Sequence, residues 1–265
     1  MPPITVSTLQ QMKQRGEKFA VLTAYDASFA QLIDEAGVEV LLVGDSLGMV
    51  VQGQGSTIPV SMDEMVYHSS LVARATKKAL VITDMPFMSY ATTELALNNA
   101  ARLMKEGGAQ MVKLEGGELR LEAVRRLAEN GIPVCAHLGL LPQSVHKLGG
   151  YRIQGREETV AEQMLADAQA LQQAGADLLV LECVPRALAK RITESLIIPV
   201  IGIGAGADTD GQVLVLYDML GITPGKRPSF SHDFLAEAGS VRAAIEAYAT
   251  QVKAGTFPTR QHDFD

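Results

Sequence analysis

One residue that could do chemistry is a carboxylate placed directly after an apolar run. In "VEVLLVGDSLG" (38–48), four apolar residues are followed by Gly44, Asp45 and Ser46. Gly, Asp and Ser all favour tight bends, so turn formation alone could explain this ending. A single run does not decide between a turn and a functional carboxylate, so the endings of the other runs matter.

Ionisable side chains end or follow several other apolar runs. In chain order these positions are Tyr25 with Asp26, Asp84, Glu115, His137 and Glu182. Each one alone has a structural explanation, since an aspartate after a strand is commonly a helix N-cap and a histidine can be hydrogen-bonded near the core. Capping and core hydrogen bonds do not explain why ionisable residues recur at the ends of successive apolar runs.

Lys113 is the hardest of these residues to explain structurally. Lysine is rarely placed among apolar neighbours without a partner. Lys113 and Glu115 are two residues apart, so in a strand both point to the same side of the sheet. If Glu115 faces the mouth of a barrel, Lys113 lies one layer below it. By the same count, His137 shares a face with Cys135.

Convergence of these side chains would require a compensating cation. Four carboxylates (Asp45, Asp84, Glu115 and Glu182) would meet only one lysine. Crowded carboxylates removed from bulk water must be protonated or neutralised. Oxygen ligation without cysteine favours Mg2+ over Zn2+. The sequence therefore predicts that Asp45 ends its strand in order to hold a metal ion.

The elements that would position these residues are eight strand-length apolar runs alternating with helical stretches. We expect strands at Phe19–Ala24, Val38–Val43, Leu80–Thr83, Gln110–Leu114, Pro133–Ala136, Leu178–Leu181, Pro199–Ile203 and Val213–Tyr217. Helices are expected at Thr92–Glu106, Leu119–Asn130, Val160–Ala174 and Pro185–Leu196. Alternation of this kind implies parallel strands joined by right-handed crossovers. Eight units of this length predict a (β/α)8 TIM barrel, whose active site lies at the carboxyl ends of the strands.

A doubly wound sheet is the structural competitor. Against it, no G-x-G-x-x-G turn follows the first strand, where a dinucleotide fold would need one. The segment "IGIGAG" (201–206) follows the seventh strand and leads to no clear helix. It could let a backbone approach a ligand, or it could allow tight packing at a strand end.

The remaining segments complete a predicted single domain over residues 1–265. Ser7 and Gln10 suggest a capping box for a short N-terminal helix that ends at Gly16. The segment 146–160 is the longest irregular stretch, and long loops in compact domains are usually functional or mobile. From His232 the chain reads as a helix through about Lys253, followed by a polar tail.

Composition excludes several classes of protein. The chain has 265 residues, of which 47% are hydrophobic, a net charge of -7 and an isoelectric point near 5.3. This balance argues against disorder and against nucleic acid as a partner. The sequence has no membrane-length apolar run and no secretory signal, and its two cysteines are too few for a disulfide scaffold. We therefore expect a cytoplasmic protein with two reduced, partly buried thiols.

Eight segments, in order and at compatible spacing, resemble the 3-methyl-2-oxobutanoate (ketopantoate) hydroxymethyltransferase family. They are "TAYD" (23–26), "LLVGDSLGMVVQG" (41–53), "DMPFMSY" (84–90), "VKLEGG" (112–117), "AHLGLLPQS" (136–144), "GGYRIQGR" (149–156), "LLVLECVP" (178–185) and "PVIGIGAG" (199–206). The resemblance implies a (β/α)8 barrel that transfers a hydroxymethyl group from 5,10-methylenetetrahydrofolate to 3-methyl-2-oxobutanoate. The product, 2-dehydropantoate, leads to pantothenate, and the transfer passes through a Mg2+-stabilised enolate.

The resemblance also implies roles for individual residues. Asp45 and Asp84 match the Mg2+ ligands, with Glu115 beside them. Ser46 and Lys113 match positions that contact the keto acid, which Asp45 and Asp84 also reach through the metal. The remaining roles carried over from the family are the proton acceptor, Glu182, and two further substrate-side groups, Tyr25 and His137. The family further implies a homo-oligomer, a decamer.

Two other functions compete with this hypothesis. The first is another Mg2+-dependent enzyme of 2-keto acids, of the isocitrate lyase or phosphoenolpyruvate mutase type, because such enzymes share a barrel and an aspartate-rich metal site. Against it, Cys135 and Cys183 lie at or beside strand ends and not in a mobile lid. The second is a barrel without activity that binds a ligand or assembles, and such a protein would be expected to have lost part of the acidic ring.

Overall fold

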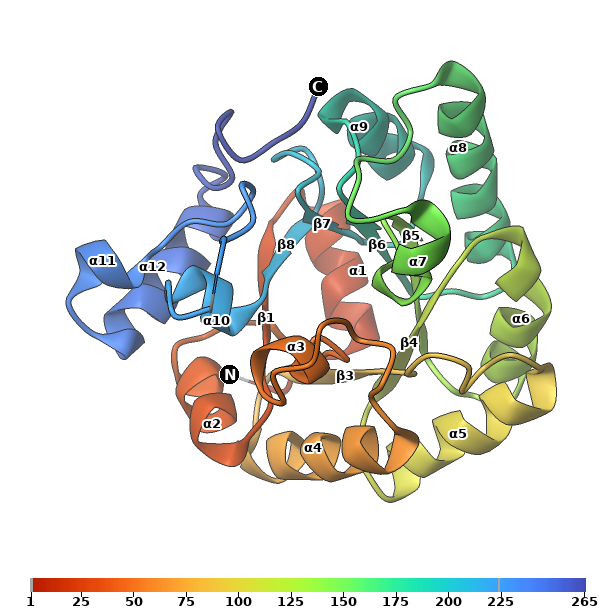
Figure 1. The fold of residues 1–265 in the computed structure, drawn as a ribbon, viewed down its shortest axis with the longest axis horizontal. Coiled ribbons are helices and arrows are strands. Elements are labelled where there is room, and N and C mark those ends of the chain that lie inside the picture. The colour runs from red at the N-terminus through yellow and green to blue at the C-terminus, as the bar shows by residue number, and fades with distance from the viewer. Residues whose placement is uncertain (1, 224) are drawn as a thin grey trace.

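Eight parallel strands close into a barrel in chain order (Figure 1), in a computed structural model that describes residues 2–223 and 225–265. They are β1 (Phe19–Thr23), β2 (Val40–Val43), β3 (Leu80–Asp84), β4 (Met111–Glu115), β5 (Val134–Gly139), β6 (Leu178–Glu182), β7 (Val200–Ile203) and β8 (Gly211–Leu214). Strand β8 pairs with β1 and completes the ring. The predicted (β/α)8 class is confirmed.

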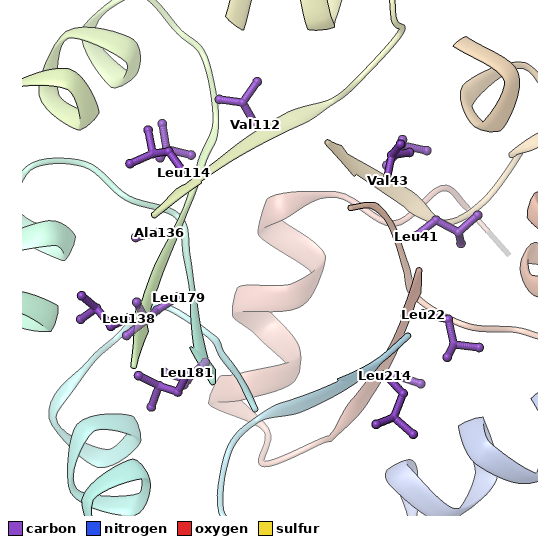
Figure 2. Packing of buried hydrophobic residues seen from close by; sticks show 14 of the residues in the cluster. Leu22, Leu41, Val43, Val112, Leu114, Ala136, Leu138, Leu179, Leu181 and Leu214 are labelled. Atoms are coloured by element: carbon purple, nitrogen blue, oxygen red, sulfur yellow. The ribbon is translucent and has the colours of Figure 1, made fainter. Parts of the chain in front are cut away.

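The strands are apolar on both faces because both faces are buried. In β1, Phe19 and Val21 point into the barrel, while Ala20 and Leu22 point outward to the helices. Figure 2 shows outward-facing side chains around the whole ring, among them Leu22 and Leu214. This two-sided burial explains why the strands appear in the sequence as continuous apolar runs.

Helices surround the ring (Figure 1). The longer ones are α2 (Ala27–Glu35), α4 (Met62–Ala75), α5 (Thr93–Lys105), α6 (Leu121–Glu129), α8 (Glu158–Gln173), α9 (Arg186–Ser195) and α12 (Val241–Lys253). The short ones are α3 (Leu47–Val50), α7 (Val145–Leu148), α10 (Leu216–Met219) and α11 (Leu235–Ala238), with 3-10 turns at Glu118–Arg120 and Pro142–Ser144. The connection from β7 to β8, residues 204–210, contains no helix, so the seventh unit departs from the expected alternation.

Helix α1 (Val6–Gln14) lies across the amino-terminal end of the barrel. It is the pale red helix seen through the ring of strands in Figure 2. Its Leu9 is fully buried among the inward-facing residues of the strands. The Lys13 ammonium binds the Asp210 carboxylate at 2.7 Å, before β8. This end of the barrel is therefore packed, which leaves the carboxyl ends of the strands for a site.

Several helices and strands begin or end at other residues than the sequence predicts. Helix α1 is capped by Thr5 and not by Ser7, since Thr5 and Thr8 form the capping box. The eighth strand ends at Leu214, and Tyr217 belongs to α10. The C-terminal helix is interrupted, because Gly239 adopts a left-handed conformation (φ 72°) and Ser240 caps a new helix, α12.

Two further expectations change in detail. His137 lies inside β5 and not at its end, because β5 continues to Gly139. The predicted irregular segment 146–160 overlaps α7 at its start and α8 at its end.

In "IGIGAG", a Cβ added at Gly202 would lie 2.7 Å from the Thr209 hydroxyl, which supports tight packing as the role of that glycine. Among the described residues, no helix is long and apolar enough to cross a membrane.

Asp34 fixes the entry to β3 and provides a test of the fold. Its buried carboxylate accepts hydrogen bonds from the backbone N–H groups of Lys77 (3.1 Å), Lys78 (2.9 Å) and Ala79 (2.7 Å). Asp34→Ala leaves these donors without their partner, which we expect to lower the free energy of unfolding by roughly 3 kcal/mol. Urea denaturation followed by circular dichroism measures this loss.

The matched control is Asp63→Ala. The Asp63 carboxylate is 85% exposed and pairs only with Arg102, so its loss should cost less than about 1 kcal/mol. Equal urea midpoints for Asp34→Ala and Asp63→Ala would contradict the role given to Asp34.

Candidate active site

A cavity of about 1100 Å³ opens at the carboxyl ends of the strands. Seven of the eight predicted site residues line it: Asp45, Ser46, Asp84, Lys113, Glu115, His137 and Glu182. The eighth, Tyr25, lies behind this wall, where its buried hydroxyl is 2.9 Å from the Ser46 hydroxyl. Asp26, which follows it, is the N-cap of α2 and accepts a hydrogen bond from the Phe29 N–H. The structure thus separates a capping aspartate from those that face the cavity.

Lys113 and Asp84 form a buried ion pair at the centre of the site. Strand register places them side by side on β4 and β3, and the Lys113 ammonium donates to the Asp84 carboxylate at 2.6 Å. Both side chains are at most 6% exposed. Burial by itself disfavours the ammonium, yet the surrounding carboxylates outweigh it and raise the pKa of Lys113. Lys113 is therefore a permanent positive charge in the floor of the cavity.

Gly44 allows the second aspartate to approach this pair. The Asp45 backbone N–H donates to the second Asp84 carboxylate oxygen at 3.1 Å. A Cβ on Gly44 would lie 2.7 Å from the Ser46 hydroxyl and 3.5 Å from that Asp84 oxygen. The "GDS" segment therefore forms a tight turn and also supplies a site carboxylate, because the turn brings Asp45 next to Asp84.

Gln143 is a site residue that sequence reasoning did not single out. Its side-chain amide donates to the Asp45 carboxylate at 2.8 Å and to the Met85 carbonyl at 2.9 Å. Its backbone N–H donates to the Glu115 carboxylate at 3.1 Å, and its amide oxygen accepts from the Tyr90 hydroxyl. Gln143 therefore holds two acidic side chains from different strands. Its presence in "LPQS", between two predicted site segments, was the available signal.

His137 lies between two carboxyl groups. Its Nδ1 atom is 3.6 Å from Glu115 and its Nε2 atom is 3.3 Å from Glu182. Neither nitrogen makes a well-aligned hydrogen bond to any residue that the structure describes. Burial, together with the nearby Lys113 charge, holds the pKa of His137 well below its usual range. We therefore assign a neutral imidazole here.

Three carboxyl groups of the site, those of Asp45, Glu115 and Glu182, lie in an environment that favours their protonated forms. Burial raises the pKa of Asp45 to about 7, and the adjacent Asp84 carboxylate contributes to the rise. Burial also raises the pKa of Glu115 well above its usual range, against the opposing effect of Lys113. Burial raises the pKa of Glu182 to about 8. A second cation in the cavity would restore the charged forms.

A sequence model of the ketopantoate hydroxymethyltransferase family matches residues 3–260. The chain belongs to this family. Relatives named 3-methyl-2-oxobutanoate hydroxymethyltransferase include one from Alkalilimnicola ehrlichii, 63% identical over 99% of this chain and 95% of the relative. Another, from Nitrosococcus oceani, is 62% identical over 97% of this chain and 98% of the relative. The family is one of enzymes, so the chain is an enzyme of the hydroxymethyltransferase class.

Solved structures with the same fold are far more distant in sequence. The crystal structure of 2,3-dimethylmalate lyase, a PEP mutase/isocitrate lyase superfamily member, aligns with a TM-score of 0.60 at 19% identity, covering 83% of this chain and 84% of that one. Phosphonopyruvate hydrolase in complex with oxalate and Mg2+ gives 0.62 at 14% identity, covering 98% and 93%. At these identities, the likeness shows that the ketopantoate hydroxymethyltransferase family shares their barrel fold.

The acidic residues of this hydroxymethyltransferase match the oxygen donors that Mg2+ prefers. Within residues 2–223 and 225–265, no group of three His, Cys, Asp or Glu side chains forms a ready-made metal cage. Mg2+ is usually held by one or two carboxylates together with water and substrate oxygens. Asp45 and Asp84 can supply that pair. The Thr57 hydroxyl also lines the cavity, is buried and has no hydrogen-bond partner among the described residues.

Gln143→Ala tests how Asp45 is held. The variant removes the amide that orients the Asp45 carboxylate, and loss of such an outer partner typically weakens metal binding by about 10–100-fold. Titration with Mn2+ followed by electron paramagnetic resonance measures this directly, without turnover. Gln163→Ala, on the exposed face of α8, is the control and should bind Mn2+ as the wild type does. Wild-type affinity in Gln143→Ala would show that the amide does not position Asp45.

Proposed function

We propose that the chain transfers a hydroxymethyl group from 5,10-methylenetetrahydrofolate to 3-methyl-2-oxobutanoate, forming 2-dehydropantoate for pantothenate biosynthesis. Family membership supports the reaction class. The observation that carries the mechanism is the meeting of Glu182, Lys113 and the Asp45–Asp84 pair in one cavity. It combines a base, a fixed positive charge and a pair of metal-binding oxygens.

The keto acid would bind against the floor of this cavity. Asp45 and Asp84 would hold Mg2+, with Glu115 beside them, and the ion when bound would supply Lewis acidity at the keto oxygen. Lys113 supplies positive charge toward the substrate carboxylate. The Ser46 hydroxyl faces the cavity with Tyr25 fixing it from behind. These contacts would orient C3 of the substrate toward Glu182.

Glu182 would act as the general base. A carboxylate with a raised pKa is a stronger base than an ordinary glutamate, and burial provides that rise here. Removal of the C3 proton breaks the C3–H bond and leaves a carbanion. Water cleaves both C–N bonds of the folate methylene group, which releases tetrahydrofolate and leaves the one-carbon unit as formaldehyde. The carbanion adds to the formaldehyde carbon, and the resulting alkoxide takes the proton back from Glu182 to become the hydroxyl group. The neutral His137, with its Nε2 atom 3.3 Å from Glu182, is placed to accept a hydrogen bond from the protonated Glu182 carboxyl group.

The rival chemistry of 2-keto acid lyases and mutases has weaker support. Structures of that type share the barrel at 14–19% identity, which is a likeness of fold. Both cysteines are buried, and burial raises the pKa of each thiol, to about 12 for Cys135. An assay for folate-dependent hydroxymethyl transfer separates the two chemistries.

The proposal extends to assembly and compartment. The family resemblance implies a decamer, and the composition and cysteine content are those expected of a cytoplasmic protein. Large apolar side chains on the surface of the single chain support burial against other copies, since Leu119 is 88% exposed and Ile197 is 79% exposed.

Asp45→Ala tests the metal assignment. The variant removes a proposed ligand, so metal-dependent turnover should be abolished, and Mn2+ binding should weaken by more than the roughly 10–100-fold typical of an outer-shell loss. The melting temperature should not fall by much, because one of several mutually repelling carboxyl groups is removed. The control is Glu94→Ala on the exposed start of α5. Near-normal turnover of Asp45→Ala at moderate Mg2+ would refute the assignment.

Glu182→Gln separates the base from the metal ligands. The change keeps the shape of the side chain but removes its basicity, so Mg2+ and the keto acid should still bind while proton removal stops. A general base contributes about 10²–10⁴-fold to a rate. Exchange of the C3 deuterium of labelled 3-methyl-2-oxobutanoate, followed by NMR without folate, measures this step. Unchanged exchange in the variant would transfer the role to another group, with His137 the next candidate.

The pH profile of the same exchange tests Glu182 as the base. A base works in its deprotonated form, and the pKa of Glu182 is raised to about 8 in the metal-free cavity. Wild-type exchange should therefore increase as the pH rises through this region, and a bound cation should move the midpoint to lower pH. This rising limb should be missing from Glu182→Gln.

A further inference from the structure

Tyr90 is a buried tyrosine that the proposed mechanism does not use. It belongs to the segment that links β3 to α5, where Met88 adopts a left-handed conformation (φ 65°) that is uncommon for residues other than glycine. The Asn99 side chain of α5 donates to the Ser89 carbonyl at 2.6 Å and holds the segment next to Tyr90. The turn and this hydrogen bond direct Tyr90 into the protein, where it is only 5% exposed.

The Tyr90 ring is held in place by Arg120. The guanidinium carbon of Arg120 lies 4.9 Å from the centre of the ring, and its Nε atom donates to the Glu115 carbonyl at 3.3 Å. A Cβ on Gly116 would lie 3.1 Å from the Arg120 side chain, so a glycine at that position leaves room for the arginine to fold back. Stacking of the cation on the ring thus fixes where the Tyr90 hydroxyl lies.

The Tyr90 hydroxyl can donate in one direction only. It accepts a hydrogen bond from the Glu115 backbone N–H at 3.3 Å. A backbone N–H group is always a donor, so the phenol proton is left for the Gln143 amide oxygen, to which Tyr90 donates. Burial raises the pKa of Tyr90, and the Glu115 carboxyl group adds to the rise, so the phenol keeps this proton.

This donation determines which way the Gln143 amide faces. With its oxygen toward Tyr90, the amide directs its NH2 group to the Asp45 carboxylate at 2.8 Å and the Met85 carbonyl at 2.9 Å. The Met85 carbonyl can only accept, so the groups at both ends of this chain of hydrogen bonds require the same direction. An amide turned over would place its oxygen against two acceptors, the Met85 carbonyl and the Asp45 carboxylate.

We propose that Tyr90 is a positioning residue of the metal site: its hydroxyl sets the direction of the Gln143 amide, which in turn holds the Asp45 carboxylate for a divalent cation. This inference rests on the metal ligands of the proposed function. Tyr90 lies outside the lining of the cavity that the described residues form, so it acts through Gln143 and not by contact with a ligand. Its hydroxyl should therefore matter only while the amide is present.

The test is a double-mutant cycle of Tyr90→Phe and Gln143→Ala, with Mn2+ binding followed by electron paramagnetic resonance. Tyr90→Phe keeps the ring and its contact with Arg120 but removes the hydroxyl. We expect the Kd for Mn2+ to increase about fivefold, the worth of one neutral hydrogen bond. In the Gln143→Ala background, the same change should have no further effect, because both variants remove one contact to Asp45. Tyr67→Phe, at a tyrosine on α4 that is 61% exposed, is the matched control.

The folate-free C3 exchange gives a second readout. In Tyr90→Phe, the Mg2+ concentration for half-maximal exchange should increase about fivefold. The exchange rate at saturating Mg2+ should stay near that of the wild type, because Glu182 is unchanged. A loss of rate at saturating Mg2+ with an unchanged Mg2+ requirement would contradict the inference.

The outcomes separate this inference from the proposed function. If Tyr90 only fills space with its ring, Tyr90→Phe binds Mn2+ as the wild type does, and the inference is overturned. It is also overturned if the loss persists in the Gln143→Ala background, since the hydroxyl would then act through the Glu115 backbone. In both cases, Mn2+ binding and C3 exchange by the wild type leave the proposed function standing. Failure of the wild type to bind Mn2+ would overturn the metal assignment, and this inference with it.

Discussion

The site depends on one buried cation among four acidic side chains. Lys113 rises from an apolar layer of the barrel interior, formed with residues such as Cys135 and Val180, and its ammonium reaches Asp84 at 2.6 Å. A buried ion pair is weak evidence for stability, since desolvation of both charges can exceed their attraction. Replacing a buried ion pair by well-packed hydrophobic residues is often neutral or stabilising. The pair is therefore best understood as a requirement of the chemistry, with the remaining negative charge left for a metal ion.

The parallel barrel is what allows such a concentration of charge. Strand register sets Glu115 beside His137 and Asp84 beside Lys113, so residues far apart in sequence become neighbours without any long side chain being stretched. Helix α1 packs the opposite end, so the charged layer opens in one direction only. Gln143 then completes the arrangement, because its side-chain amide holds the Asp45 carboxylate and its backbone N–H holds the Glu115 carboxylate.

The sequence predicted the barrel and most of the site for identifiable reasons. Continuous apolar runs reveal strands that are buried on both faces. The two-residue period of a strand places Lys113 and Glu115 on the same face of the sheet, with Lys113 one layer below. The sequence could not reveal Gln143, because its role depends on a turn that returns the chain to two other strands. Nor could it show that Tyr25 lies behind Ser46, since the period of a strand no longer applies once the strand has ended. The predicted start of α1 was wrong because two nearby residues, Thr5 and Ser7, could each cap the helix and only the structure shows that Thr5 does.

The separation of charge within one cavity also suggests an order of events for the reaction that we propose. The floor of the cavity is acidic, so an anionic keto acid would bind there only against Lys113 and a bound cation. Arg152, Arg156, Lys226 and Arg227 also line the cavity, so an anionic folate would be attracted to its mouth whether or not the floor is occupied. A folate seated across the mouth would obstruct the route to the floor. The arrangement therefore favours keto acid binding first, with the folate binding over it.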